Sequence, residues 1–415
     1  MRKLTGRWLI AVSTGPDSMA LLSMCMENHM DICVGHVNYH HRDQAEEEEA
    51  YIRAFCKENH IPLYVRNEPF HSTGNFEADA RKWRYDFFEK IVKEEHLDGV
   101  LTAHQEDDVL ETWYMQKERN IIPKCWGLAE VNMYHGMVVR RPLLGYTKKQ
   151  LEEYCDHRHV RYYIDHTNKD DTYSRNRIRN HVTSSMDRKQ RDEILKEIEK
   201  ANIHLIQFRD KAENLICDES VSLKEYRKEN EEVRCCILRM MMDPDNAYHM
   251  TLAYLKEIDH ILLKQNDFVI PVKGKELVSD HERFFMHVPF ETYEDTYTSL
   301  DEMHGIEKSC YRITEGKKGV FACSVTDKDF PLIIRSVKEG DQIAMCYGNK
   351  SVHRFFIDRH IPKYLRCTWP VVVNTQGHII LVPLLGCDRW HYTVKPDFNV
   401  IEYNLTEGDF RDVGR

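Results

Sequence analysis

The chain has 415 residues, and its 58 Lys and Arg against 68 Asp and Glu give a formal net charge of −10. This length suggests about two to four domains, each large enough to bury its own core. A hydrophobic content of 42% and a charged content of 30% exclude disorder, collagen and coiled coil as whole-chain descriptions. No apolar run reaches about 18 residues, so the sequence predicts no membrane span.

The 13 cysteines are scattered along the chain, and no pair has C-x-x-C spacing. This pattern argues against a zinc ribbon, an iron–sulfur cluster or a dithiol redox pair, and it is typical of buried cysteines in a reducing cytosol. The basic N-terminus lacks a cleavage site and is interpreted as the start of a first strand. We therefore expect a cytoplasmic protein. Its acidic balance argues against indiscriminate nucleic-acid binding but permits nucleic acid as a substrate.

Residues 7–105 alternate between strand-like and helix-like segments. This alternation predicts an α/β domain with a Rossmann-like parallel sheet. Ligands of such sheets bind at the carboxyl ends of strands, so the loops after Val12, Val37 and Ala103 are the expected site. The expected strands are 7–12, 31–37, 61–65 and 99–103, and the expected helices are 18–28, 44–58, 76–95 and one that begins near residue 107.

After the α/β segment, the sequence pattern becomes helical and then changes to short β-like runs. Periodic Ile and Leu among charged residues predict a helical linker at 187–228, and 229–320 is expected to form a mostly helical middle domain. Short β-like runs at 332–335, 371–373 and 378–382, with a basic helix at 353–359, predict a small α+β domain at 321–415.

Four patches carry chemistry, and the first follows the first strand directly. It comprises Ser13, Thr14, Gly15, Pro16, Asp17 and Ser18. A turn of small residues lets backbone N–H groups approach a phosphate, and the helix N-terminus behind it favours negative charge. The Gly-Lys-Ser/Thr ending of a Walker A loop is missing. An ordinary strand–helix turn is an equally good interpretation of this patch alone.

The second patch, residues 104–112, follows the fourth strand. Asp108 and Glu111 are three residues apart, so a helix projects both carboxylates from one face. At the end of a strand they are suited to Mg²⁺ or to a substrate ammonium group. Acidic residues that complement a helix dipole are the commoner explanation of such a pair.

The third and fourth patches are cationic. Arg81 and Arg84 share a helix face, and Arg175, Arg177 and Arg179 alternate with other residues at 172–180. Arginine pairs and clusters suit phosphate recognition. Solvated helix faces with ion pairs explain both patches equally well in isolation.

Taken together, these patches resemble the tRNA(Ile)-lysidine synthase family of the N-type ATP pyrophosphatase group. The resemblance covers residues 7–182 and resumes more weakly near the C-terminus. It is carried by residues 13–18, His36-Val37-Asn38, Glu77 to Tyr85, His104 to Thr112, Arg141 to Leu144 and Arg175 to Arg179. The C-terminal match is carried by Ile334 to Ser336, Gly340-Asp341, Phe356 to Asp358 and Ile361-Pro362.

The resemblance implies that ATP activates the wobble cytidine of a tRNA(Ile) with a CAU anticodon and that L-lysine is then attached to its C2 carbon. It implies an ATP-pyrophosphatase catalytic domain at 1–186, with ATP and Mg²⁺ as cofactors and Asp17 as the metal ligand. Asp108 and Glu111 would bind lysine. The implied catalytic residues are Asp17, Asp108, Glu111 and Arg175, and ATP would contact residues 13–18, His36 and Asn38.

The resemblance also implies that the C-terminal domain, 321–415, contacts tRNA. Arg354 and Arg359 are the expected phosphate contacts there, together with Lys350, His353, Lys363 and Arg366. With Arg81, Arg84, Arg175, Arg177 and Arg179 they complete the expected phosphate-binding or tRNA-binding set. A solvated face is the alternative for the C-terminal cations. Whether the chain forms a homodimer is left open.

Thr14 departs from the family pattern because it replaces the first of two glycines, and we expect it to be tolerated if its φ is negative. The loop at 117–131 also departs and is expected to have a different shape. Two other functions stay open. A tRNA thiolase of the same group would share residues 13–18 but needs paired cysteines or a cluster. A non-enzymatic or catalytically weakened RNA-binding relative would give Asp17, Asp108 and Glu111 no role.

Overall fold

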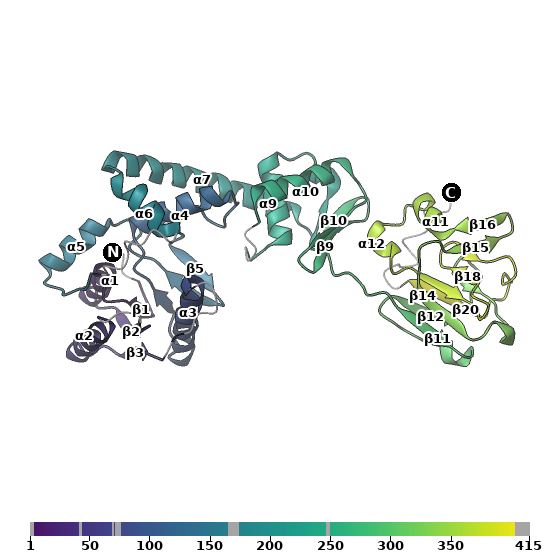
Figure 1. Ribbon diagram of the computed structural model, residues 1–415, viewed down its shortest axis with the longest axis horizontal. Helices are drawn as coiled ribbons and strands as arrows, with labels where there is room; N and C mark the ends of the chain where they lie inside the picture. Colours follow the sequence, from purple (N-terminus) through teal and green to yellow (C-terminus); the bar gives the residue numbers. More distant parts are fainter. Residues whose placement is uncertain are drawn as a thin grey trace. The chain divides into compact units, whose positions relative to one another are not determined.

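The computed structural model of the protein describes residues 4–40, 44–68, 70, 76–164, 174–245 and 250–402, apart from the side chains at 76–78, 174–176 and 402. The chain divides into two compact units, 1–207 and 208–415. Figure 1 shows their helices and strands, coloured along the sequence. Among the described helices, none is both long and apolar enough to cross a bilayer.

The first unit is built on a six-stranded sheet with the order β3-β2-β1-β4-β6-β5. All neighbouring strands are parallel except β5, which pairs with β6 in an antiparallel hairpin. The predicted Rossmann-like sheet is confirmed. The strands are β1 Arg7–Val12, β2 Asp31–Val37, β3 Leu63–Arg66, β4 Gly99–Leu101, β5 Val131–Tyr134 and β6 Met137–Arg140.

Helices cover both faces of this sheet. In β1, Ile10 packs into a core with Met19 and Ile52, whereas Leu9 packs into a second core with Phe88. Strands buried on both faces are nearly all apolar, which explains the unbroken apolar run of β1. The helices are α1 Pro16–Glu27, α2 Ala45–Glu58, α3 Phe76–Glu94, α4 Glu106–Arg119, α5 Lys148–His157 and α6 Ser174–His181.

The strand order changes direction at β1, which pairs with β2 on one side and with β4 on the other. The loops that follow β1, β2 and β4 therefore diverge at the carboxyl edge of the sheet and leave a crevice. The sequence predicted this edge as the ligand site.

The expected linker begins with one long helix, α7 Arg188–Leu215, and continues with β7 Ser220–Ser222 and α8 Leu223–Tyr226. The helix passes the division between the two units at residue 207. The proposed domain boundaries at 186, 228 and 320 stay predictions.

The middle region is less helical than expected. After α9 Glu231–Met242 and α10 Leu252–Lys264, the chain forms β8 Val269–Val272, β9 Lys275–Ser279 and β10 Arg283–His287, which make a sheet with β7. The missed signal is Lys273-Gly274, where both residues have positive φ and connect β8 to β9 as a tight hairpin. Pro271 is tolerated because β8 is an edge strand.

The C-terminal part is β-rich, as expected, with helix α11 Val352–Asp358 near the predicted basic helix. The three predicted strands are present as β14 Leu332–Ser336, β17 Pro370–Val373 and β18 Ile379–Val382. They are neighbours in one sheet that also contains β11 Glu294–Tyr297, β15 Gln342–Met345, β16 Gly348–Ser351 and β19 Gly386–Cys387. A smaller sheet joins β12 Tyr311–Glu315, β20 Phe398–Glu402 and β13 Ala322–Cys323, and a short helix is α12 Lys363–Arg366.

Candidate active site

The loop between β1 and α1 is closed by its own serines. The Ser18 hydroxyl accepts a hydrogen bond from the Ser13 backbone N–H (3.2 Å) and donates one to the Gly15 carbonyl (3.0 Å). Helix α1 begins at Pro16, with Gly15 as its N-cap, so its first turn faces the end of β1. Because the first N–H groups of a helix lack intrahelical partners, this turn can bind an anion.

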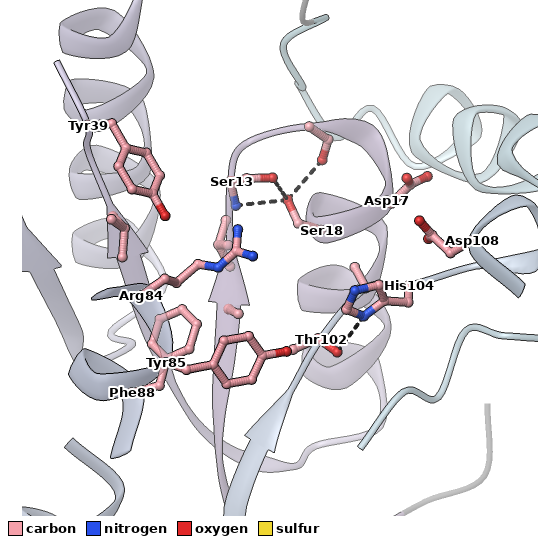
Figure 2. Close-up of a pocket in the computed structure, with 15 residues that line it drawn as sticks. Ser13, Asp17, Ser18, Tyr39, Arg84, Tyr85, Phe88, Thr102, His104 and Asp108 are labelled. Atoms are coloured by element: carbon pink, nitrogen blue, oxygen red, sulfur yellow. Dashed lines mark hydrogen bonds between the residues drawn. The ribbon is translucent and has the colours of Figure 1, made fainter. Parts of the chain in front are cut away.

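A cavity of about 230 Å³ opens at this loop, at the carboxyl ends of the strands, where ligands of parallel α/β sheets bind. The lining comes from all three predicted loops and from α3 and α4 (Figure 2). It comprises Ala11, Val12, Ser13, Gly15, Asp17, Ser18, Val37, Tyr39, Arg84, Tyr85, Phe88, Thr102, Ala103, His104 and Asp108.

Asp17 and Asp108 line one side of this cavity, from the first turns of α1 and α4 (Figure 2). Burial, and then the charge of Asp108, raise the pKa of Asp17 to about 7, although Lys148 opposes this shift. Among the described residues, buried Oδ1 of Asp17 has no hydrogen-bond partner. Two close carboxylates with an unpartnered oxygen fit a hard cation such as Mg²⁺, which prefers oxygen ligands.

Thr14 is strained. Its φ is +61°, in the left-handed region that β-branched residues rarely adopt, so the condition under which the sequence predicted that Thr14 is tolerated is not met. The side chain is fully buried and donates to the Ser13 carbonyl (2.6 Å), and the Thr14 carbonyl accepts from the Tyr163 N–H (2.9 Å). These contacts hold a conformation that glycine would adopt without strain.

Of the two arginines on α3, only Arg84 lines the cavity, and Figure 2 shows its guanidinium directed toward the Ser13–Ser18 loop. The Arg81 guanidinium lies 4.8 Å from the centre of the Tyr85 ring. Three aromatic residues that line the cavity, Tyr39, Tyr85 and Phe88, were not predicted as site residues. Tyr39 follows the His36–Asn38 motif, and Tyr85 is the last residue of the Glu77–Tyr85 motif.

His36 and Asn38 are buried beside the cavity and have internal partners. The His36 Nδ1 lies 2.9 Å from the Val12 carbonyl, and burial lowers the pKa of His36. Asn38 donates to Glu49 (3.0 Å) and accepts from the His40 N–H (2.9 Å). Neither residue is among those that line the cavity, so both support the loop that carries Tyr39.

The carboxylate of Glu111 is fully buried, and the described part of the cavity lining does not include it. Arg179 on α6 binds it in a bidentate manner at 2.6 and 3.1 Å. Arg177 on the same helix binds Glu118 at 2.8 and 3.0 Å. Arg175 also belongs to α6, but its side chain is outside the described part of the chain. The arginines described on α6 therefore hold this helix against α4.

The sequence missed two arginines at the start of α7. Arg188 binds Glu106 at 2.8 and 3.1 Å, and Arg191 binds both Asp107 and Glu106. Glu106 is only 2% exposed, so these bonds compensate a buried charge. Their signal is weak, because arginines are common on charged helices.

The predicted C-terminal cations belong to the second unit. Arg354 and Arg359 are exposed, as is His353. Arg366 instead binds Asp267 (2.9 Å), and Lys363 donates to the Asp267 carbonyl (2.8 Å). Lys350 pairs with Asp358 (3.5 Å).

The loop that departs from the family pattern is folded against α4 and α7. Gln116 accepts from the Gly127 N–H (2.8 Å), and Asn202 bonds both the N–H and the carbonyl of Trp126 (2.8 and 3.0 Å). A Cβ at Gly127 would lie 2.9 Å from Val109, so the loop approaches α4 as closely as glycine allows.

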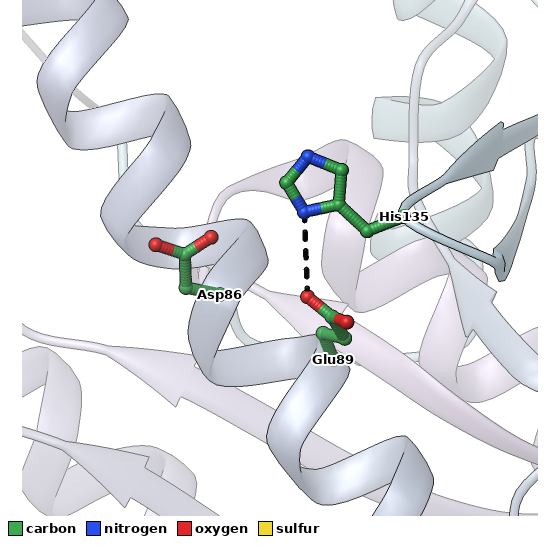
Figure 3. A group of neighbouring side chains, drawn as sticks. All are labelled: Asp86, Glu89 and His135. Carbon is green, nitrogen blue, oxygen red and sulfur yellow. Dashed lines mark ion pairs between the residues drawn. The ribbon is translucent and has the colours of Figure 1, made fainter. Parts of the chain in front are cut away.

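Asp86 and Glu89 of α3 and His135 of the β5–β6 turn form a group outside the cavity, with ligand atoms within 4.8 Å of one another (Figure 3). Each carboxylate also pairs with a lysine of the same helix, Asp86 with Lys82 and Glu89 with Lys93, both at 2.5 Å. We interpret the group as ion pairs that hold the hairpin against α3.

Comparisons with known proteins place this geometry in a family context. The PP-loop domain family matches residues 2–186. The tRNA(Ile)-lysidine synthase of Mycoplasma mycoides is 28% identical over 398 residues, which cover 90% of this chain and 96% of that protein. The enzyme of the same name from Streptococcus mutans is 29% identical and covers 91% of this chain and 89% of its own length.

A more similar but shorter match is the tRNA(Ile)-lysidine synthase of Ureaplasma parvum, which is 39% identical over 184 residues. This match covers 43% of this chain and 55% of that protein. Sequence similarity is therefore strongest over a stretch about as long as the PP-loop match, and it extends over most of the chain at lower identity.

Proposed function

The chain belongs to the tRNA(Ile)-lysidine synthase family of PP-loop ATP-dependent ligases, and on that premise we propose that it attaches L-lysine to C2 of the wobble cytidine of a tRNA(Ile) with a CAU anticodon. ATP would adenylate the C2 carbonyl oxygen and release pyrophosphate. The lysine ε-amine would then attack C2 and lose a proton, and AMP would leave. The same proposal includes a cytoplasmic location.

The observation that carries the proposal is a cavity lined by the Ser13–Ser18 loop, which contains Asp17, and by Asp108 of α4. The Ser13–Ser18 loop and the first turn of α1 would bind the ATP phosphates. Arg84, directed toward the same loop, would add a cation for the charge that develops when pyrophosphate leaves. Asp108 would bind the ammonium group of lysine and orient it toward the cytidine.

Asp17 is the residue we expect to hold Mg²⁺, because its buried oxygen has no partner in the part of the chain that the structure describes. The cation would neutralise charge on the phosphates when bound. Glu111 stays a predicted lysine ligand, but its bidentate bond with Arg179 favours a supporting role.

A thiolase is less well supported. Such an enzyme needs cysteines at the reaction centre, and none of the described residues that line the cavity is a cysteine.

The test is incorporation of radiolabelled lysine into a tRNA(Ile) CAU transcript in the presence of ATP and Mg²⁺. We expect ATP-dependent label on this transcript and none on a transcript with U in place of the wobble C. Release of one AMP for each lysine incorporated would identify the adenylated intermediate.

If the protein binds ATP and tRNA but incorporates no labelled lysine into the transcript, the proposal is overturned. That result would favour the alternative of a non-enzymatic RNA-binding protein. Label on both transcripts would contradict the proposed specificity for cytidine.

A further inference from the structure

The first turn of α7 is joined to the first turn of α4 by ion pairs that the proposed function does not use. Arg191 has a side chain only 16% exposed, and it bonds Asp107, Glu106 (3.5 Å) and the Thr183 carbonyl (2.8 Å). Because three acceptors fix one guanidinium, Arg191 has a defined position relative to α4.

A short chain of hydrogen bonds leads from Arg191 to the cavity. Asp107 accepts from the Gln105 side-chain amide (3.2 Å), and the Gln105 side-chain oxygen accepts from the Asp107 N–H (2.8 Å). The Gln105 backbone N–H then donates to the Asp108 carboxylate (2.9 Å). Gln105 is 3% exposed, so the hydrogen bonds that it makes are shielded from water.

We propose that Arg191 is a positioning residue for the ligase, which acts through Asp107 and Gln105 to hold the Asp108 carboxylate toward the cavity. The proposal rests on the proposed function, in which Asp108 binds lysine. Arg191 itself does not line the cavity.

The physical reason is charge balance in the first turn of α4. Glu106, Asp107 and Asp108 are consecutive carboxylates, and their mutual repulsion would displace the turn if no cation compensated it. Arg188 compensates the buried Glu106, and Arg191 reaches both Glu106 and Asp107. A lysine side chain at position 191 would retain the positive charge of Arg191 but not the several N–H donors of its planar guanidinium group.

The experiment compares Arg191→Gln, Arg191→Lys and Asp192→Asn in the full chain, with lysine incorporation into the tRNA transcript as the assay. Asp192→Asn is the matched control, because it breaks the exposed Arg188–Asp192 pair and leaves the bonds to Glu106 and Asp107. For Arg191→Gln we expect the KM for lysine to rise about tenfold while the KM for tRNA stays unchanged, and for Arg191→Lys a rise of about threefold.

The outcome that overturns the proposal is an unchanged KM for lysine in Arg191→Gln, with only a lower kcat or melting temperature, since that is the signature of a structural role. An equal rise in Asp192→Asn would overturn it as well.

A double-variant cycle adds a second test. If Arg191 acts through Asp107, then Arg191→Gln combined with Asp107→Asn should be no worse than Arg191→Gln alone, whereas multiplied effects would contradict the proposed route.

Failure of the proposed function is distinguishable from failure of this inference. If the unmodified protein incorporates no lysine, the ligase proposal fails. The route from Arg191 is then tested by equilibrium binding of L-lysine. Arg191→Gln should weaken this binding about fivefold and Asp192→Asn should not, and equal affinity in all variants would overturn the inference.

Discussion

The mostly parallel sheet of the first unit and the seven-stranded sheet of the second are both flanked by shielded carboxylates, but the surroundings of these carboxylates differ. In the first unit, a buried oxygen of Asp17 has no hydrogen-bond partner among the described residues. In the second, His391 lies between Asp388 (2.6 Å) and Asp329 (3.1 Å), so both carboxylates have a hydrogen-bond partner within the protein. The comparison teaches that the unsatisfied oxygen of Asp17, which lies in a cavity, is suited to a ligand, whereas the satisfied network around His391 is suited to stabilising the fold.

The largest change in activity is expected from substitution of Asp17, the carboxylate with an unpartnered oxygen. Asp17→Asn should lower kcat/KM for lysine incorporation by about a hundredfold to a thousandfold, because the cavity loses the charge that would hold Mg²⁺. Stability should not fall. The folded pKa of about 7 lies above the unfolded value, so ionisation of Asp17 costs stability as the pH rises from about 4 through 7.

We therefore expect Asp17→Asn to melt at an equal or higher temperature than the unmodified protein at pH 8, by calorimetry. A lower melting temperature at that pH would mean that Asp17 has a structural role. Asp17 would then not differ in this respect from Asp329 and Asp388 of the second unit.

Glu111 lies in the first unit but, like Asp329 and Asp388, has a partner within the protein, so it tests whether a partnered carboxylate there is structural. Glu111→Gln should destabilise the protein by about 3 kcal/mol, because it leaves the half-buried Arg179 without its bidentate partner. Urea unfolding measures this change. Glu118→Gln, which breaks the exposed Arg177 pair on the same helices, is the control and should cost less than about 1 kcal/mol. Unchanged stability with a raised KM for lysine would instead support Glu111 as a lysine ligand.

The network in the second unit predicts a pH dependence of stability. Hydrogen bonds to Asp388, and then to Asp329, raise the pKa of His391. Its contribution is therefore complete below the unfolded pKa of about 6.5 and is lost as the pH rises through the higher folded pKa. We expect a loss of about 2 kcal/mol across this window, the value typical of hydrogen bonds to charged groups.

Urea unfolding between pH 6 and pH 9 checks this prediction, with His391→Gln showing a flatter profile. His353→Gln, at an exposed site of the same unit, should keep the unmodified profile. A flat profile in the unmodified protein would show that the His391 network does not stabilise the second unit.

The smallest effect is expected at Thr14. Thr14→Gly removes a left-handed β-branched residue, which costs about 1–2 kcal/mol, and adds the entropy cost of glycine, about 0.5–1 kcal/mol. The net stabilisation should be about 0.5 kcal/mol, measured as a higher melting temperature. Thr14→Ala retains the strained φ and loses the hydroxyl bond to Ser13, so it should not be stabilising.

Much of the first unit could be predicted from the sequence, because strand–helix alternation and short loops fix the order of a parallel sheet. The predicted strand at 7–12 matches β1, and the predicted helix at 76–95 matches α3 to within one residue. The middle region could not be predicted as well, since β8 and β9 are short, and Pro271 weakens the strand signal.

The site was predictable where its residues are consecutive in the sequence. The Ser13–Ser18 loop and Asp108 line one cavity, as the strand-end rule predicts. What the sequence could not show is which polar side chains already have partners. Asn38 and Glu111 match family motifs as well as Asp17 does, but their partners Glu49 and Arg179 are identified only by the three-dimensional structure.

The segment that matches the PP-loop domain ends at residue 186, and Arg188 and Arg191 follow it. A fragment cut at that boundary would contain Glu106, which is 2% exposed, without the cations that neutralise it. The segment that matches the PP-loop family is thus shorter than the segment that balances its own charge. A shortened protein meant to retain the cavity must therefore extend at least through the first turn of α7.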